Sequence, residues 1–168
     1  MKGLDLSACA TLILVLACAG CATSPEVQER TRATEEEIES ILSQPLEAAE
    51  YGETKRCLAG NEYRNFRVLD DQRILFEGRG GKFWLNTLRT RCPDLRFATA
   101  LRVKSMYSYG RICDMDTFQP TDWFDWPWYR RWPWDWRNRP GTGMTCSLGK
   151  FQPVTGAQVE SIEAALRR

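Results

Sequence analysis

Residues 63–85 read YRNFRVLDDQRILFEGRGGKFWL, a stretch in which short apolar runs alternate with turn signals. Asp70-Asp71 interrupts the apolar pattern once, and Gly78-Arg79-Gly80-Gly81 interrupts it again. Such clusters favour tight turns, because Asp side chains bond the nearby backbone and glycine permits positive φ angles. Two turns in succession predict an antiparallel meander. Its three strands are expected over 63–69, 74–76 and 83–85.

The same pattern extends beyond the meander. Further candidate strands lie over 98–109, 111–118 and 147–151. Near the C-terminal end, Thr155 and Gln158 have the spacing of a capping box, which predicts the start of a helix. The apolar residues that follow fall on one face of that helix: Val159, Ile162 and Leu166.

A second helix, amphipathic, is expected over 34–49. Thr34 and Glu37 have capping-box spacing at its start, and Pro45 should end or kink it near Ser43. Its narrow apolar stripe consists of Ile38, Ile41 and Leu42. The predicted fold class is α+β and β-rich: a small antiparallel sheet or partly closed barrel flanked by an N-terminal and a C-terminal helix.

Residues 1–20 have the composition of a secretory signal, with Lys2 followed by an apolar run too short to span a bilayer. The end of this segment resembles a bacterial lipobox, in which a small residue precedes a lipidated cysteine. Cys21 is favoured as that cysteine, because its modification leaves an even number of cysteines in the mature chain. Cys18 stays open as the alternative, as does a cleaved signal without lipid. Residues 21–33 are polar and are expected to form a tether.

Four cysteines lie in the expected domain over 55–168: Cys57, Cys92, Cys113 and Cys146. In an exported protein of this size, an even set predicts two disulfides. Four cysteines allow three connectivities, of which we prefer Cys57–Cys92 with Cys113–Cys146. No metal site is expected, because no two of these cysteines have C-x₂₋₄-C spacing and the chain contains no His.

Composition argues against several classes of function. The chain has 23 basic and 22 acidic side chains and a formal net charge of +1, whereas nucleic-acid-binding proteins normally carry a basic field. The absence of His removes the commonest general base. Asp70 and Asp71 are adjacent and are expected to serve a turn, while Asp114 and Asp116 lack the rest of a calcium loop. No catalytic constellation is visible, so neither enzymatic activity nor a cofactor is expected. The alternative is an envelope enzyme or enzyme accessory that uses carboxylates such as Asp70 or Asp116.

Several short motifs follow one another in a fixed order. They include Cys57, FRVLDD at 66–71, GGK at 80–82, Cys92-Pro93, Ile112-Cys113-x-Met115-Asp116 and Cys146-x-Leu148-Gly149-x-Phe151. This set resembles a family of exported Gram-negative domains of unknown function, which follow a lipoprotein-type signal and share the four-cysteine framework. The resemblance covers residues 55–155 and implies no catalytic residue or ligand. The chain differs from the family pattern over residues 119–143, where relatives have a short Gly-rich turn and this chain has a Trp-rich insertion.

Six of the seven Trp residues lie within 123–136. Pro127 and Pro133 forbid a continuous helix there. In an extended chain, alternation places one set of side chains on a single face: Trp126, Trp128, Arg130, Trp132, Trp134 and Trp136. Five indoles carry about 1,000 Å² of surface, more than the roughly 300–600 Å² apolar patch that monomers expose. This face is therefore expected to contact its own domain, the membrane interface, or an envelope glycan or protein.

Together these features predict a membrane-anchored cell-envelope lipoprotein that acts by binding or structural interaction. Its expected location is the outer membrane, facing the periplasm, because neither candidate cysteine is followed by Asp, as in Gram-negative lipoproteins that reach this membrane. The expected partners are the membrane, through the lipid anchor, and an envelope glycan or protein. No nucleic-acid partner is expected.

Overall fold

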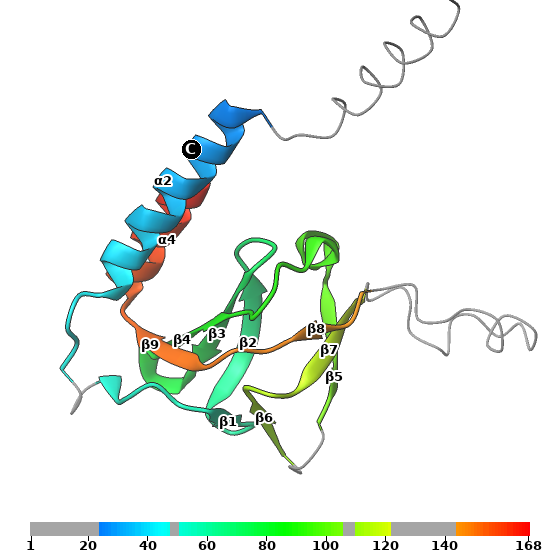
Figure 1. Ribbon diagram of the computed structural model, residues 1–168. Coiled ribbons are helices and arrows are strands. Elements are labelled where there is room, and N and C mark those ends of the chain that lie inside the picture. The colour runs from blue at the N-terminus through cyan, green and yellow to red at the C-terminus, as the bar shows by residue number, and fades with distance from the viewer. Residues whose placement is uncertain (1–23, 48–50, 106–109, 122–143) are drawn as a thin grey trace, which may run out of the picture. The chain divides into compact units, whose positions relative to one another are not determined.

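The computed structural model describes residues 24–47, 51–105, 110–121 and 144–168 (Figure 1). The chain divides into two compact units, Met1–Glu37 and Ile38–Arg168. In the second unit, antiparallel strands form a two-stranded, a four-stranded and a three-stranded sheet. The predicted α+β class is confirmed. Among the described residues the strands form these separate sheets rather than one sheet, and the sheets do not close into a barrel.

Helix α2 spans Pro25–Leu42, so the predicted start at Thr34 was wrong. Proline at the first helical position is favourable, because its missing N–H would have no partner there, and the hydroxyl of Ser24 accepts a bond from the Val27 N–H at 3.4 Å. Thr34 lies inside the helix, where its hydroxyl donates to the Arg30 carbonyl oxygen at 3.0 Å. The tether expected over 21–33 is therefore helical from Pro25 onward. The helix ends at Leu42, before residue 49 and close to the stop expected from Pro45.

The predicted meander is confirmed. Strands β2 (Tyr63–Val68), β3 (Arg73–Gly78) and β4 (Phe83–Thr87) pair in sequence, and β9 (Phe151–Val154) joins the free edge of β4. The glycine-rich turn is a short 3₁₀ segment, η1 (Arg79–Gly81), in which Gly80 and Gly81 have φ angles of 70° and 75°. These left-handed angles favour glycine, which explains the composition of this turn.

The other two sheets differ from the prediction in their boundaries. Strand β5 (Ala100–Lys104) lies within the expected 98–109, but the expected strand 111–118 is two strands, β6 (Arg111–Cys113) and β7 (Thr117–Thr121). The break occurs because Asp116 makes a turn: its side chain accepts a bond from the Cys113 N–H at 2.8 Å. The expected strand 147–151 is likewise divided between β8 (Cys146–Ser147) and β9. Strand β1 (Cys57–Ala59) was not predicted.

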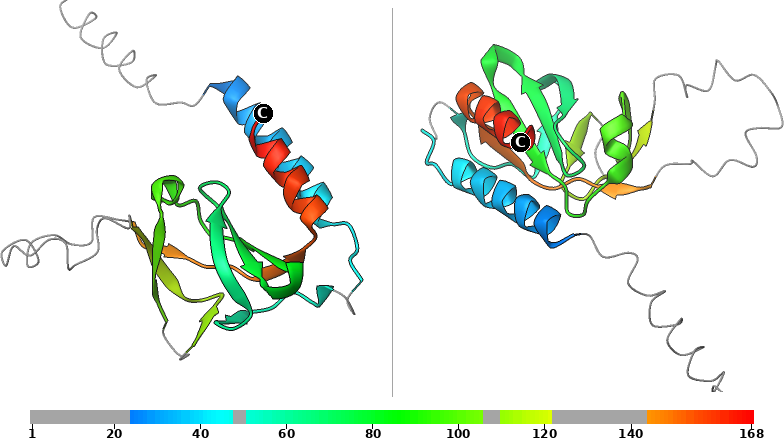
Figure 2. Two further views of the ribbon diagram at one scale, coloured as in Figure 1. Left: turned by 180° about the vertical axis from the view of Figure 1, so that it is seen from behind. Right: turned by 90° about the horizontal axis from the view of Figure 1, so that it is seen from above.

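The four-stranded sheet separates two apolar cores, because successive residues of a strand point to opposite faces. Ile74 and Phe76 belong to the core shared with the sheet β5-β7-β8, whereas Leu75 belongs to the core beneath helix α4 (Gly156–Leu166). Figure 2 shows α4 on one side of this sheet and β5–β7 on the other. The predicted capping box of Thr155 and Gln158 is present.

The end of α2 belongs to the second core. Ile38 is 1% exposed and packs with Val159 and Ile162 of α4. The Gln158 side-chain amide also donates to the Ile41 carbonyl oxygen at 3.0 Å. The compact unit therefore begins at Ile38, earlier than the domain boundary expected at residue 55.

Candidate functional site

Two disulfides are present, Cys57–Cys113 and Cys92–Cys146. The existence of two bridges among these four cysteines is confirmed, but the preferred connectivity, Cys57–Cys92 with Cys113–Cys146, was wrong. The register of β1 with β6 places Cys57 directly opposite Cys113. That leaves Cys92, at the start of the 3₁₀ segment η2 (Pro93–Phe97), to bond Cys146 of β8.

The Cys92–Cys146 bridge lies beside the two chain positions that flank the Trp-rich stretch. Phe118 of β7 pairs with Cys146 of β8, and the Met144 N–H donates to an Asp94 side-chain oxygen at 3.1 Å. Residues 122–143, and with them the predicted face of Trp126, Trp128, Arg130, Trp132, Trp134 and Trp136, lie outside the described residues. The chain that enters and leaves this stretch is thus fixed on a disulfide-bonded frame.

The first residues of the predicted insertion, 119–143, lie in a strand of the domain. Gln119, Pro120 and Thr121 belong to β7 and pair with β5, with Thr121 opposite Ala100. Two large apolar side chains in the segments next to β7 and β8 are exposed: Phe97 of η2 is 83% exposed and Met144 is 53% exposed.

Asp70 and Asp71 serve the turn between β2 and β3, as predicted. Asp70 accepts a bond from the Gln72 N–H at 2.7 Å and from the buried Arg73 guanidinium at 2.6 Å. Asp71 is turned toward other partners, the guanidinium groups of Arg91 and Arg96. The two carboxylates therefore do not act on a shared atom.

Asp114 and Asp116 are both buried and also hold local structure. Asp114 forms an ion pair with Arg56 at 3.2 Å, and Asp116 bonds the Cys113 N–H. Within the described ranges, no three His, Cys, Asp or Glu residues are placed to hold a metal ion. The carboxylates that could have supported the enzyme alternative, Asp70 and Asp116, are both engaged in turns.

One charged cluster was not predicted. The Lys55 ammonium bonds the Glu62 carboxylate and lies 4.7 Å from the centre of the Trp84 ring. The other Glu62 oxygen accepts a bond from the Ala59 N–H at 2.8 Å. The hydrogen bond from Lys55 first, and that from Ala59 second, lower the pKa of Glu62 below its ordinary value. This cluster fixes the chain before and after β1 onto the four-stranded sheet.

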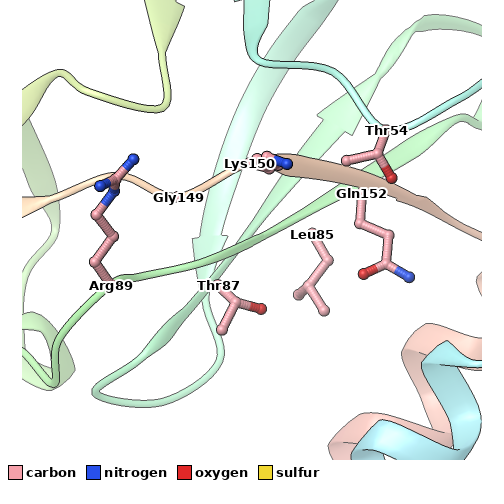
Figure 3. A pocket seen from close by; sticks show the side chains of 7 residues that line it. All are labelled: Thr54, Leu85, Thr87, Arg89, Gly149, Lys150 and Gln152. Carbon is pink, nitrogen blue, oxygen red and sulfur yellow. The ribbon is translucent and has the colours of Figure 1, made fainter.

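A groove of about 380 Å³ lies where β4 and β9 separate (Figure 3). Figure 3 shows Leu85 and Gln152 in its middle, with Arg89 at one end and Thr54 at the other. The full lining is Thr54, Leu85, Thr87, Arg89, Gly149, Lys150 and Gln152. Arg89 and Lys150 are far apart in sequence and belong to no motif, so only the fold shows that they share a site.

The candidate lipidation residues Cys18 and Cys21 lie outside the described residues. Among the helices that the structure describes, none is long and apolar enough to cross a membrane.

Comparison with known proteins connects the chain to one uncharacterised group. Neither a curated protein nor a solved structure matches it. Residues 4–122 match a family of unknown function (DUF6491). The matched range includes α2 and the strands through β7, whereas the resemblance noted from the motifs extends over residues 55–155. The match ends where the Trp-rich stretch begins. Because it covers more than half of the chain, the chain belongs to this family of unknown function, DUF6491.

Proposed function

We propose that this protein is a lipid-anchored component of the bacterial cell envelope that binds a partner through its Trp-rich stretch. The observation that carries this proposal is the frame around residues 122–143. The bridge Cys92–Cys146 and the bond between Asp94 and Met144 hold the flanking chain in place. A segment presented from a rigid frame loses less conformational freedom on binding than one presented from a loose loop.

The aromatic content of the segment supports binding. Trp and Arg are enriched among residues that dominate binding energy, and the predicted face contains five Trp and one Arg. The exposed side chains of Phe97 and Met144 are further apolar groups that a partner could contact. The engagement of Asp70 and Asp116 in turns favours binding over carboxylate chemistry.

The disulfides support the proposed location. Disulfides persist in oxidising compartments such as the periplasm and are rare in the cytosol. Cys21, with Cys18 as the alternative, would carry the lipid, and the polar chain that follows it would join α2. Each acyl methylene that enters the membrane contributes about 0.8 kcal/mol, so the acyl chains alone would hold the protein there.

The binding proposal is tested by replacing residues 122–143 with a short Gly-Ser linker. We expect the variant to melt at the same temperature as the wild type and to lose binding to envelope material. Trp84 remains in the variant and is 4% exposed, so its emission reports an intact core. In the wild type, a blue shift on adding lipid vesicles identifies the membrane interface as the partner. Quenching by soluble peptidoglycan fragments identifies a glycan.

A large drop in melting temperature would instead show that the tryptophans pack on their own domain, and the binding proposal would be wrong. The anchor is tested separately by palmitate labelling in cells. Cys21→Ala should abolish the label and Cys18→Ala should retain it. The reverse result assigns the lipid to Cys18, and a wild-type protein that takes up no label would refute the anchor.

A further inference from the structure

The groove lies where β4 and β9 separate, at the end of the sheet face that carries α4. Leu85 lies opposite Gln152 in the β4–β9 ladder, and alternation places Thr87 on the same face as Leu85. The Gln152 side-chain amide donates to the Leu42 carbonyl oxygen at 3.1 Å, so the end of α2 borders the groove. Leu85 is 1% exposed, so the accessible surface of the groove belongs mainly to the residues around it.

The walls of this groove are rigidly placed. Asn86, which is 0% exposed, donates to the Gly149 carbonyl oxygen at 2.7 Å and accepts from the Gly149 N–H at 3.0 Å. A Cβ atom at Gly149 would lie 1.9 Å from the Thr87 carbonyl oxygen, so only glycine allows this approach. Asn86 thereby extends the contact between β4 and the segment before β9 beyond the end of the ladder. These bonds fix the backbone next to Thr87 and Lys150.

The described residues that line the groove give it a positive charge. Of the seven described residues that line it, two are cationic and none carries a carboxylate. Arg89 donates to the Met115 sulfur at 3.2 Å, a weak and neutral acceptor. Neither Arg89 nor Lys150 forms an ion pair within the part of the chain that the structure describes. By contrast, Arg56, Arg67 and Arg73 are each paired with a carboxylate.

We infer that this groove binds a phosphate ester of a small polyol. Arg89 and Lys150 would hold the phosphate oxygens through charge-assisted hydrogen bonds. The hydroxyl groups of Thr54 and Thr87 and the side-chain oxygen of Gln152 would bond the hydroxyl groups of the polyol. A volume of about 380 Å³ is within the range of small-ligand sites. The lining residues lie outside residues 122–143 of the sequence, and the proposal does not depend on the function proposed for the Trp-rich stretch.

The proposal is tested on the full chain with Cys18 and Cys21 replaced by Ser, so that no acyl chain contributes to binding. Glycerol 1-phosphate and inorganic phosphate are titrated while amide chemical shifts are followed, with glycerol as the neutral control. We expect saturable shifts at Gly149 and Lys150 with glycerol 1-phosphate. Vesicles of phosphatidylcholine with and without phosphatidylglycerol test the same headgroup on a lipid. Binding of the soluble ester or of the phosphatidylglycerol vesicles supports the proposal and identifies the source of the phosphate.

A double variant, Arg89→Gln with Lys150→Gln, should weaken this binding by about tenfold or more, since two charge-assisted bonds are lost. The matched control is Arg102→Gln with Lys104→Gln, which removes the same charge from exposed positions of β5 outside the groove. It should leave the affinity unchanged. The variant Arg89→Lys with Lys150→Arg retains both charges and should still bind glycerol 1-phosphate. Equal weakening in the two Gln variants, or no saturable binding of any phosphate probe, would overturn the proposal.

Discussion

Cys57 and Cys113 lie directly opposite each other in the β1–β6 pair, with their Cα atoms 4.0 Å apart, and are joined by a disulfide. Both residues are partly exposed, whereas Cys92 and Cys146 are 0% and 1% exposed. A reducing thiolate must reach a sulfur atom to attack it. Dithiothreitol should therefore reduce Cys57–Cys113 first in the native protein, as timed alkylation and peptide mapping would measure.

In guanidinium chloride the difference in reduction rate should disappear, because unfolding exposes all four sulfur atoms. Equal reduction rates for the two bridges in the native protein would contradict this prediction.

Removal of either bridge should raise the entropy of the unfolded chain, and so lower the stability of the fold, by a similar amount. The two sequence separations are 56 and 54 residues, and closing loops of this length corresponds to about 4 kcal/mol in the chain-entropy estimate. Replacing Cys92 and Cys146 by Ala should cost more than replacing Cys57 and Cys113, because the first pair is also buried and leaves a cavity. Urea unfolding of both double variants measures the difference, and a larger loss for Cys57 and Cys113 would show that burial does not decide it.

Asn86 should be one of the most sensitive polar positions. Asn86→Ala leaves the buried N–H and carbonyl group of Gly149 without the bonds that Asn86 makes, and should lower the free energy of unfolding by about 3 kcal/mol. Asn65→Ala, at an exposed position of β2, is the matched control and should change it by less than about 0.5 kcal/mol. Similar midpoints in urea for the two variants would refute a role for the Asn86 bonds in stability.

The features that the sequence predicted correctly are local. The three strands of residues 63–85 and the capping box of Thr155 and Gln158 depend on spacings of a few residues. The start of α2, which was predicted wrongly, also has a local signal, since Ser24 and Pro25 form an N-cap and first-turn pair within the expected tether. The groove and the disulfide pairing have no such signal.

The disulfide connectivity depends on a strand of three residues, β1, that is too short to show a period. Arg89 and Lys150 line one groove only because Asn86 holds Gly149 against β4, and nothing in the sequence near either cation indicates this arrangement. Burial of Asn86 is what a sequence pattern would least predict, because Asn is usually exposed.

The hydrogen bonds to Glu62 should make stability fall in acid. Its pKa is lowered from 4.5 in the folded protein, so its contribution is complete above that value and is lost as the pH falls through the lower folded pKa. Glu62→Gln should therefore lower the melting temperature at neutral pH, and the difference from wild type should shrink as the pH falls below 4.5. Glu160→Gln, on the exposed side of α4, is the control and should cause no difference at any pH. A difference for Glu62→Gln that stays constant into acid would show that the carboxylate charge does not stabilise the fold, and that only the shape of the side chain matters at this position.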